Sequence, residues 1–188
     1  GTPGGGRPDG LRAGKGKAGR LHLPLQAQTR ADQRAPGARL LDMSRQQFAA
    51  TCAENLASVP HVIGVNNHRG SLLTRHPGHM GWLMEELQAR GGLFFVDSYT
   101  THRSVALQVA EEAGVRAARR DVFLDSDRTP AAVAGEFARL LTLARQHGSA
   151  IAIGHPYPET LEFLEAALPR LAAEGIDLVR LGDLVGEP

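Results

Sequence analysis

The chain has few of the residues that build cysteine sites, stacking surfaces or membrane spans. Cys52 is the only cysteine among 188 residues, which excludes an internal disulfide and a zinc cage made of cysteines. One tryptophan and two tyrosines are too few to predict a base-stacking surface, and a formal net charge of +1 gives no electrostatic drive toward nucleic acid. No apolar run approaches the roughly 20 residues that span a bilayer, and no signal-peptide pattern is present. We therefore expect a globular protein with no nucleic-acid partner and no membrane span.

The first 19 residues differ in composition from the rest of the chain. They are rich in glycine and basic residues and almost lack apolar groups. Such a segment buries too little apolar surface to offset the conformational entropy lost on ordering. The composition predicts a disordered or poorly ordered tail over 1–19 and one α/β domain over 20–188.

Apolar runs typical of buried strands alternate with helix patterns along the domain. The strand-like runs are 21–25, 61–65, 93–96, 117–123, 150–153 and 176–180. The helix patterns are 44–58, 77–90, 105–113, 129–148 and 158–173. This alternation predicts parallel pairing with right-handed crossovers. About six strands fit either an incomplete (β/α) barrel or an open doubly wound sheet.

Polar residues follow most of these strand-like runs. They are His22, then Asn66, Asn67 and His68, then Asp97 and Ser98, then Arg120, Asp121 and Asp125, and finally His155. Because the carboxyl ends of parallel strands share one edge, we expect these groups to converge at one opening. Two imidazoles with one or two carboxylates suit a zinc-like metal that keeps a position open for water. The pattern is typical of metal-assisted hydrolysis.

Each candidate also has a purely structural interpretation. His22 lies between leucines and fits a hydrogen-bonded core residue, which spacing alone favours. His68 fits a capped turn as well as a site, and Asp97 with Ser98 fits a helix cap. The carboxylates flanking Phe123 are interpreted as surface ion pairs with nearby arginines, the commoner outcome. For His155, held between Gly154 and Pro156, the stiff loop favours function.

Four stretches in order resemble the divergent polysaccharide deacetylase family. They are Gly64–Ser71, Leu93–Ser98 with Thr100 and Thr101, Ala118–Asp125, and Gly148–Thr160. The resemblance implies an incomplete, distorted (β/α) barrel of about six parallel strands with flanking helices, and metal-dependent hydrolysis of N-acetyl groups on a carbohydrate. It implies that His22 and His68 are ligands of a divalent metal, zinc by that comparison. It also implies Asp97, His155 and Asp121 as catalytic or supporting groups, and Asn66, Asn67, Ser71, Arg120 and Tyr157 as substrate-binding residues.

The chain also departs from the pattern of this family. Members begin with a strand that ends in paired aspartates, and no Asp-Asp pair occurs in this sequence. We expect that strand to be absent here, which leaves two imidazoles as a weak site for a hydrolytic metal. The alternative hypothesis is a truncated or degenerate relative that binds carbohydrate, or serves as a scaffold, without turnover. A periplasmic or extracytoplasmic location is implied by the resemblance alone.

Overall fold

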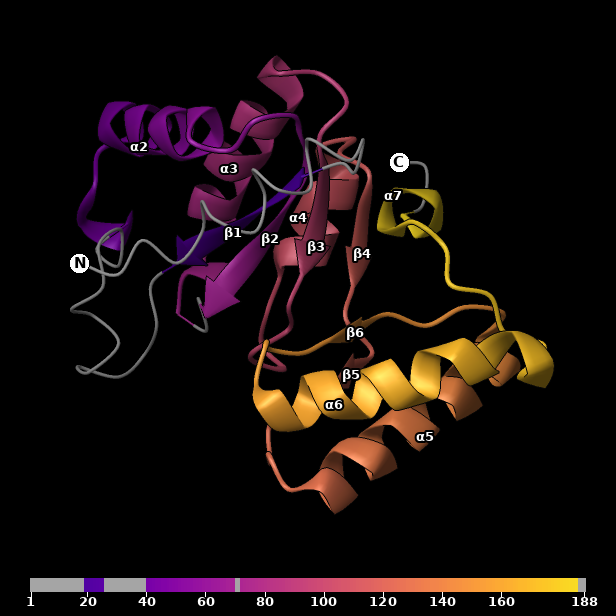
Figure 1. Cartoon of the computed structure of the whole chain (residues 1–188). Helices are drawn as coiled ribbons and strands as arrows, with labels where there is room; N and C mark the ends of the chain where they lie inside the picture. Colours follow the sequence, from indigo (N-terminus) through magenta and orange to yellow (C-terminus); the bar gives the residue numbers. More distant parts are fainter. Residues whose placement is uncertain (1–18, 26–39, 70–71, 186–188) are drawn as a thin grey trace. The chain divides into compact units, whose positions relative to one another are not determined.

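The computed structural model describes residues 19–25, 40–69 and 72–185, and of residues 19–25, 68 and 69 it describes the backbone only (Figure 1). The predicted tail, apart from Gly19, lies outside these residues, and so does Ser71. The chain divides into two compact units, residues 1–118 with 185–188, and residues 119–184. The single domain over 20–188 stays a prediction.

The first unit is built on a sheet with the strand order β1-β2-β3-β4. The strands are β1 (Gly19–Leu25), β2 (Val62–Arg69), β3 (Phe94–Asp97) and β4 (Ala117–Arg119), whose last residue is counted with the second unit. The pairs β1–β2 and β2–β3 are parallel, as the alternation predicts. At the carboxyl ends of β2 and β3, the residues that follow Val65 lie beside the residues that follow Phe95.

Helices α2 (Arg45–Ala57), α3 (Pro77–Ala89) and α4 (Ala106–Glu112) belong to the same unit (Figure 1). Ser44 caps α2 in a reciprocal capping box with Gln47, so two free backbone N–H groups of the first turn are bonded. Phe48, Cys52 and Leu56 are buried along one face of α2, as their spacing predicts. The three helices predicted in this half are confirmed to within about two residues at their ends.

His79 is partly buried in the core of this unit. Its ring lies 4.5 Å from the ring of Trp82 and 6.2 Å from that of Phe48, measured between centroids. Within the described part of the chain, the buried Nε2 atom has no hydrogen-bond partner. Burial lowers the pKa of His79 below 6.5, the nearby His76 lowers it further, and a hydrogen bond with the Leu41 backbone opposes both.

This lowered pKa makes the stability of the protein depend on pH. The unfolded chain binds a proton at His79 more readily than the folded chain. The neutral ring therefore contributes its full share of the stability above pH 6.5, and this share is lost as the pH falls below 6.5. In His79→Gln we expect a smaller fall in the urea midpoint between about pH 8 and pH 5.5 than in the original protein. His147→Gln alters an exposed histidine and is the matched control. Equal pH dependence in His79→Gln and the original protein would contradict the role of His79.

The second unit contains a parallel pair of short strands, β5 (Val122–Phe123) and β6 (Ala152–Ile153). Its helices are α5 (Pro130–His147), α6 (Pro158–Ala167), the 3-10 helix η4 (Leu168–Glu174) and α7 (Leu181–Leu184). Thr129 caps α5 by accepting from the Ala132 N–H, and Gly148 ends that helix with a left-handed φ of 83°. These bounds match the predicted helix over 129–148.

Three predictions in this half differ from the structure. The strand over 117–123 is two short strands, β4 and β5, in different sheets. The helix over 158–173 continues beyond Ala167 as a 3-10 helix, because Pro169 lacks the N–H that an α-helix needs. The segment 176–180 forms no strand, and no described segment pairs with it; Leu178 and Val179 are 68% and 53% exposed.

The fold class is therefore mixed α/β with parallel sheets, as predicted, whereas the six-stranded barrel stays a prediction. The described strands form one four-stranded sheet and one two-stranded sheet. No helix among the described residues combines the length and apolar character required to cross a bilayer.

Candidate functional site

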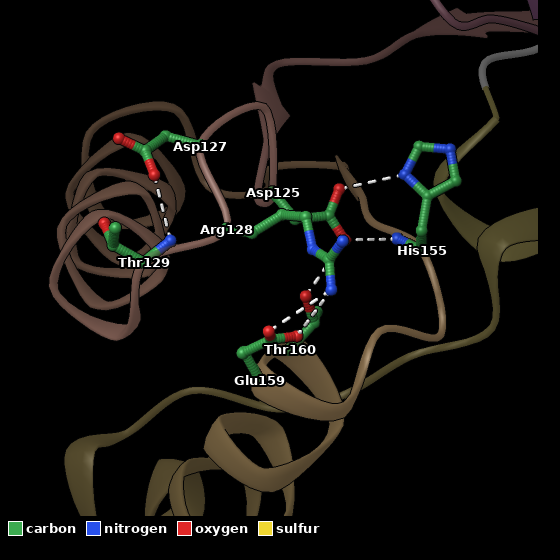
Figure 2. Close-up of polar contacts among 7 residues, drawn as sticks. All are labelled: Asp125, Asp127, Arg128, Thr129, His155, Glu159 and Thr160. Carbon is green, nitrogen blue, oxygen red and sulfur yellow. Dashed lines mark hydrogen bonds and ion pairs between the residues drawn. The ribbon is translucent and has the colours of Figure 1, made fainter.

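Asp125 and His155 meet just beyond the carboxyl ends of β5 and β6 (Figure 2). Phe123 and Ile153 are partners in this parallel pair, and the two titratable residues each follow two positions later. His155 Nδ1 lies 3.0 Å from Asp125 Oδ1, and the His155 backbone N–H donates to Asp125 Oδ2. The register of the two strands thus joins groups that are 30 residues apart in the chain.

The Asp125 carboxylate is fully buried, and both of its oxygens are hydrogen-bonded. Its side chain is 0% exposed, and Oδ2 also accepts from the Thr160 hydroxyl at 3.0 Å. Thr160 is itself buried in the first turn of α6. A Cβ at Gly154 would lie 3.3 Å from Oδ2, so the backbone also approaches the carboxylate closely. With two backbone or hydroxyl donors on one oxygen and an imidazole on the other, the position of this carboxylate is fixed.

The imidazole of His155 is oriented by this carboxylate and open on its other side. A carboxylate only accepts hydrogen bonds, so the bond to Asp125 places a proton on Nδ1. The His155 side chain is 35% exposed, and no described residue bonds to Nε2. An imidazole held at Nδ1 with Nε2 available can give or take a proton at a reacting atom.

Aromatic and charged side chains surround this imidazole. The Phe123 ring lies 5.5 Å from it, edge to face, and the Tyr157 ring lies 5.2 Å away at 34°, centroid to centroid. The Arg128 guanidinium carbon sits 4.1 Å from the Tyr157 ring centroid. Arg128 Nη2 also lies 3.2 Å from both carboxylate oxygens of Glu159, a pair visible in Figure 2.

Asp121 and Arg120, predicted to support catalysis and to bind substrate, lie at the other end of β5. Asp121 precedes the strand, is exposed, and its Oδ2 accepts from the Ile151 N–H at 2.8 Å. The Arg120 guanidinium carbon is 5.0 Å from the Phe123 ring centroid. The structure therefore joins Asp125, and not Asp121, with His155. Asp121 ties together the amino ends of β5 and β6.

In the first unit, the asparagines after Val65 are hydrogen-bonded to the end of β3. The Ser98 N–H donates to Asn67 Oδ1 at 2.7 Å, and the Ser98 hydroxyl donates to the Asn67 carbonyl at 2.6 Å. Asn66 Nδ2 donates to the Ser98 hydroxyl oxygen at 3.2 Å. Asn67 is 0% exposed and Ser98 is 3% exposed, so this cluster fixes the ends of β2 and β3 against each other.

Asp97 organises the loop that follows β3. Its Oδ1 accepts from the Tyr99 N–H at 2.8 Å and its Oδ2 accepts from the Ser104 hydroxyl at 2.7 Å. Tyr99 adopts a left-handed φ of 47°, a conformation that costs a residue with a Cβ about 1 kcal/mol or more. The Asp97 carboxylate, 1% exposed, thereby holds a strained backbone turn at this strand end.

The two histidines predicted to bind metal occupy neighbouring strands. His22 is the register partner of Asn66, and His68 is the register partner of Pro24. The two histidines are therefore offset by two residues along the paired strands. The described part of the chain contains no group of three or more histidine, cysteine, aspartate or glutamate side chains able to hold a metal. Ser71 lies outside the described residues. The proposed metal-ligand roles of His22 and His68 stay predictions.

Comparison with known proteins identifies the family. The family model described as divergent polysaccharide deacetylase matches residues 11–185. The chain belongs to this family. The family resemblance read from the sequence is thereby confirmed, and it spans both compact units.

Two curated relatives and one solved structure extend this comparison. An uncharacterized protein of Haemophilus influenzae is 43% identical over 166 residues, covering 87% of this chain and 58% of that protein. The uncharacterized protein YibQ of Escherichia coli is 36% identical over 147 residues, covering 78% of this chain and 46% of that protein. The chain thus spans about half the length of the curated relatives it matches. The crystal structure of an uncharacterized protein of Agrobacterium tumefaciens has a TM-score of 0.81 at 21% identity, covering 92% of this chain and 70% of that one, which shows the fold alone.

The His155 cluster was recognised only in part from the sequence. Asp125 was among the strand-end groups expected to converge with His155, but it was interpreted as half of a surface ion pair, and the structure buries it beside His155 instead. Thr160 gave no signal beyond its place in a helix. The equal spacing of Asp125 and His155 after paired strand ends is the feature that could have revealed the pair, once the register of β5 and β6 was known.

Proposed function

We propose that the protein hydrolyses N-acetyl groups on a carbohydrate, with His155 as the residue that protonates the leaving amine. The observation that supports this proposal is the buried Asp125 carboxylate on Nδ1, which leaves Nε2 of a half-exposed imidazole available. Membership of the deacetylase family supports the substrate class. An extracytoplasmic setting, where structural polysaccharides are found, is part of the same proposal.

The chemistry assigned to His155 is the transfer of one proton from water to the leaving amine. Water adds to the acetamide carbonyl carbon as Nε2 takes a proton from it, which forms a tetrahedral intermediate and a charged imidazole. The C–N bond of the intermediate then breaks as the amine nitrogen takes that proton from Nε2, which releases the free amino sugar and acetic acid that ionises to acetate. Asp125 keeps the Nδ1 proton in place throughout, because it accepts that bond in both the neutral and the charged imidazole.

The remaining predicted roles belong to the proposal. Asp97 is proposed as a further catalytic group. Substrate contacts are proposed for Asn66, Asn67, Ser71 and Arg120. The bond from the Ser98 N–H to Asn67 and the bond from the Tyr99 N–H to Asp97 support a role in shaping the ends of β2 and β3.

Zinc, held by His22 and His68, is the cofactor proposed. A bound zinc would supply a water activated for attack near neutral pH. Hydrolytic zinc takes three protein ligands, and two imidazoles are one short of that set. We therefore assign no step to the metal. Zinc titration tests the site: the original protein should bind zinc more tightly than His68→Ala, and equal binding would contradict the assignment.

Acetate release tests the proposed activity. The protein, with zinc added, is incubated with N-acetylated chitooligosaccharides and with peptidoglycan fragments, and the released acetate and the free amine are both measured. Deacetylation produces acetate and amine in equal amounts. We expect release from at least one of the two, lost in His155→Gln. Saturable sugar binding without acetate would support the alternative function, a carbohydrate-binding protein without turnover. Acetate release that persists in His155→Gln would contradict the role of His155.

A further inference from the structure

A run of neighbouring side chains extends from the His155 imidazole to the surface of the second unit. Tyr157 is next to the imidazole, with ring centroids 5.2 Å apart at 34°. The Arg128 guanidinium lies 4.1 Å from the same tyrosine ring, and Glu159 binds that guanidinium through both carboxylate oxygens. The tyrosine thus lies beside the Arg128 guanidinium and beside the candidate acid at the same time.

The backbone at Tyr157 is as constrained as its ring. Pro156 precedes it and Pro158 follows it as the first residue of α6. A residue before proline is restricted to extended conformations, and Tyr157 has φ −73° and ψ 146° as the N-cap of that helix. Glu159, in the first turn of α6, is favoured by the helix dipole, and its pKa is lowered by the backbone N–H at that helix end and by Arg128. The partner that fixes Arg128 is therefore itself held in place in its charged form.

We propose that Tyr157 is a positioning residue that fixes the plane of the His155 imidazole, and that Arg128 and Glu159 hold the tyrosine ring for this purpose. The inference rests on the proposed function for what His155 does. The sequence predicts that Tyr157 binds substrate; in this inference Tyr157 instead acts through His155. Asp125 bonds one atom of the imidazole, Nδ1, and this single side-chain bond still allows the plane of the ring to tilt. Phe123 on its edge and Tyr157 beside it restrict that tilt.

Such positioning matters because a proton donor acts over a short distance. A displacement of about 1 Å at the reacting atom can lower turnover by about 100-fold. Loss of the tyrosine ring should therefore lower kcat for acetate release about 10- to 100-fold while KM changes little. A residue that binds the substrate directly would show the opposite pattern, a raised KM with kcat retained.

The test compares Tyr157→Leu, Tyr157→Phe and Arg128→Met with the original protein. Phenylalanine keeps the ring and should keep kcat, and Arg128→Met should lower kcat in the same direction as Tyr157→Leu but by less. The matched control is Arg139→Met. Arg139 pairs with Glu136 on α5 at 3.0 Å, with side chains 57% and 35% exposed, against 52% and 36% for Arg128 and Glu159. If Tyr157→Leu does not fold, Arg128→Met and Tyr157→Phe still decide the matter.

A second measurement does not depend on activity. In protein labelled at histidine, the His155 ring signals, assigned by their loss in His155→Gln, should broaden in Tyr157→Leu and shift in Arg128→Met. They should stay as in the original protein in Tyr157→Phe and Arg139→Met. Unchanged His155 signals in both Tyr157→Leu and Arg128→Met would overturn the inference, and so would a raised KM with kcat retained. If no substrate is turned over but the ring signals respond as expected, the proposed function fails while the positioning role stands.

Discussion

Asp125→Asn is expected to lower the turnover of acetate release by about 10²- to 10⁴-fold. Asparagine has nearly the shape of aspartate, so the Thr160 hydroxyl and the His155 backbone N–H keep an acceptor at the oxygen they share. The amide nitrogen then faces His155 Nδ1. Because that nitrogen donates, the neutral imidazole must carry its proton on Nε2 and accept at Nδ1, which reverses the tautomer. Initial rates of acetate release on an N-acetylated oligosaccharide measure the loss.

Two other aspartates of the same unit serve for comparison. Asp127 accepts from the Thr129 N–H at 2.9 Å in the exposed loop, and Asp127→Asn is the matched control with turnover near that of the original protein. Asp121→Asn tests the position that the sequence predicted as catalytic. Its carboxylate bonds the Ile151 N–H at the far end of the strand pair, so its replacement should affect stability more than turnover. A larger loss of turnover in Asp121→Asn than in Asp125→Asn would contradict the assignment of the pair.

Gly64→Ala is expected to destabilise the protein by about 2–3 kcal/mol. A Cβ at this position of β2 would lie 2.4 to 2.6 Å from three atoms of the Phe94 ring, closer than carbon atoms approach. Phe94 is 2% exposed and belongs to β3, whose four residues are all buried, so the ring has little room to move. The midpoint of urea or thermal unfolding measures the change.

Gly81→Ala is the matched control for this substitution. Gly81 lies inside α3, and a Cβ there would meet no atom within 4 Å. Alanine should stabilise that helix by about 0.5–1 kcal/mol, because glycine is the poorer helix former. The double variant Gly64→Ala with Phe94→Leu should recover part of the lost stability, since the shorter side chain vacates the space. Equal unfolding midpoints for Gly64→Ala and the original protein would contradict the close approach of β2 and β3.

Local signals in the sequence predicted most of the elements. The helices predicted over 44–58 and 129–148 begin at the caps Ser44 and Thr129, as the structure confirms, because a cap acts within a few residues of itself. The strand predicted over 176–180 was wrong for the opposite reason. Its apolar residues favour a strand, but a strand forms only when it pairs with another strand. Whether such a partner exists cannot be read from the neighbouring residues of the sequence.

The candidate site could be predicted only in part, for the same physical reason. His155 was selected from its stiff loop between Gly154 and Pro156, a local property. The burial of Asp125 depends on the packing of β6 and α6 around it, and these elements lie about 30 residues further along the chain. The residues close to Asp125 in the sequence therefore favoured a surface ion pair, the commoner outcome. The partial burial of His79 also depends on a distant residue, because Phe48 belongs to α2 and His79 to α3.

The protonation of the His155 ring nitrogens is the most direct test of the central claim, that the buried Asp125 directs one proton to Nδ1 and leaves Nε2 open. It is measured by nitrogen NMR of histidine-labelled protein at a pH where the ring is neutral, with His155 assigned by its loss in His155→Gln. A protonated Nδ1 and an unprotonated Nε2 are expected, with the reverse in Asp125→Asn. A proton on Nε2 in the original protein, or the same tautomer in both proteins, would contradict the claim.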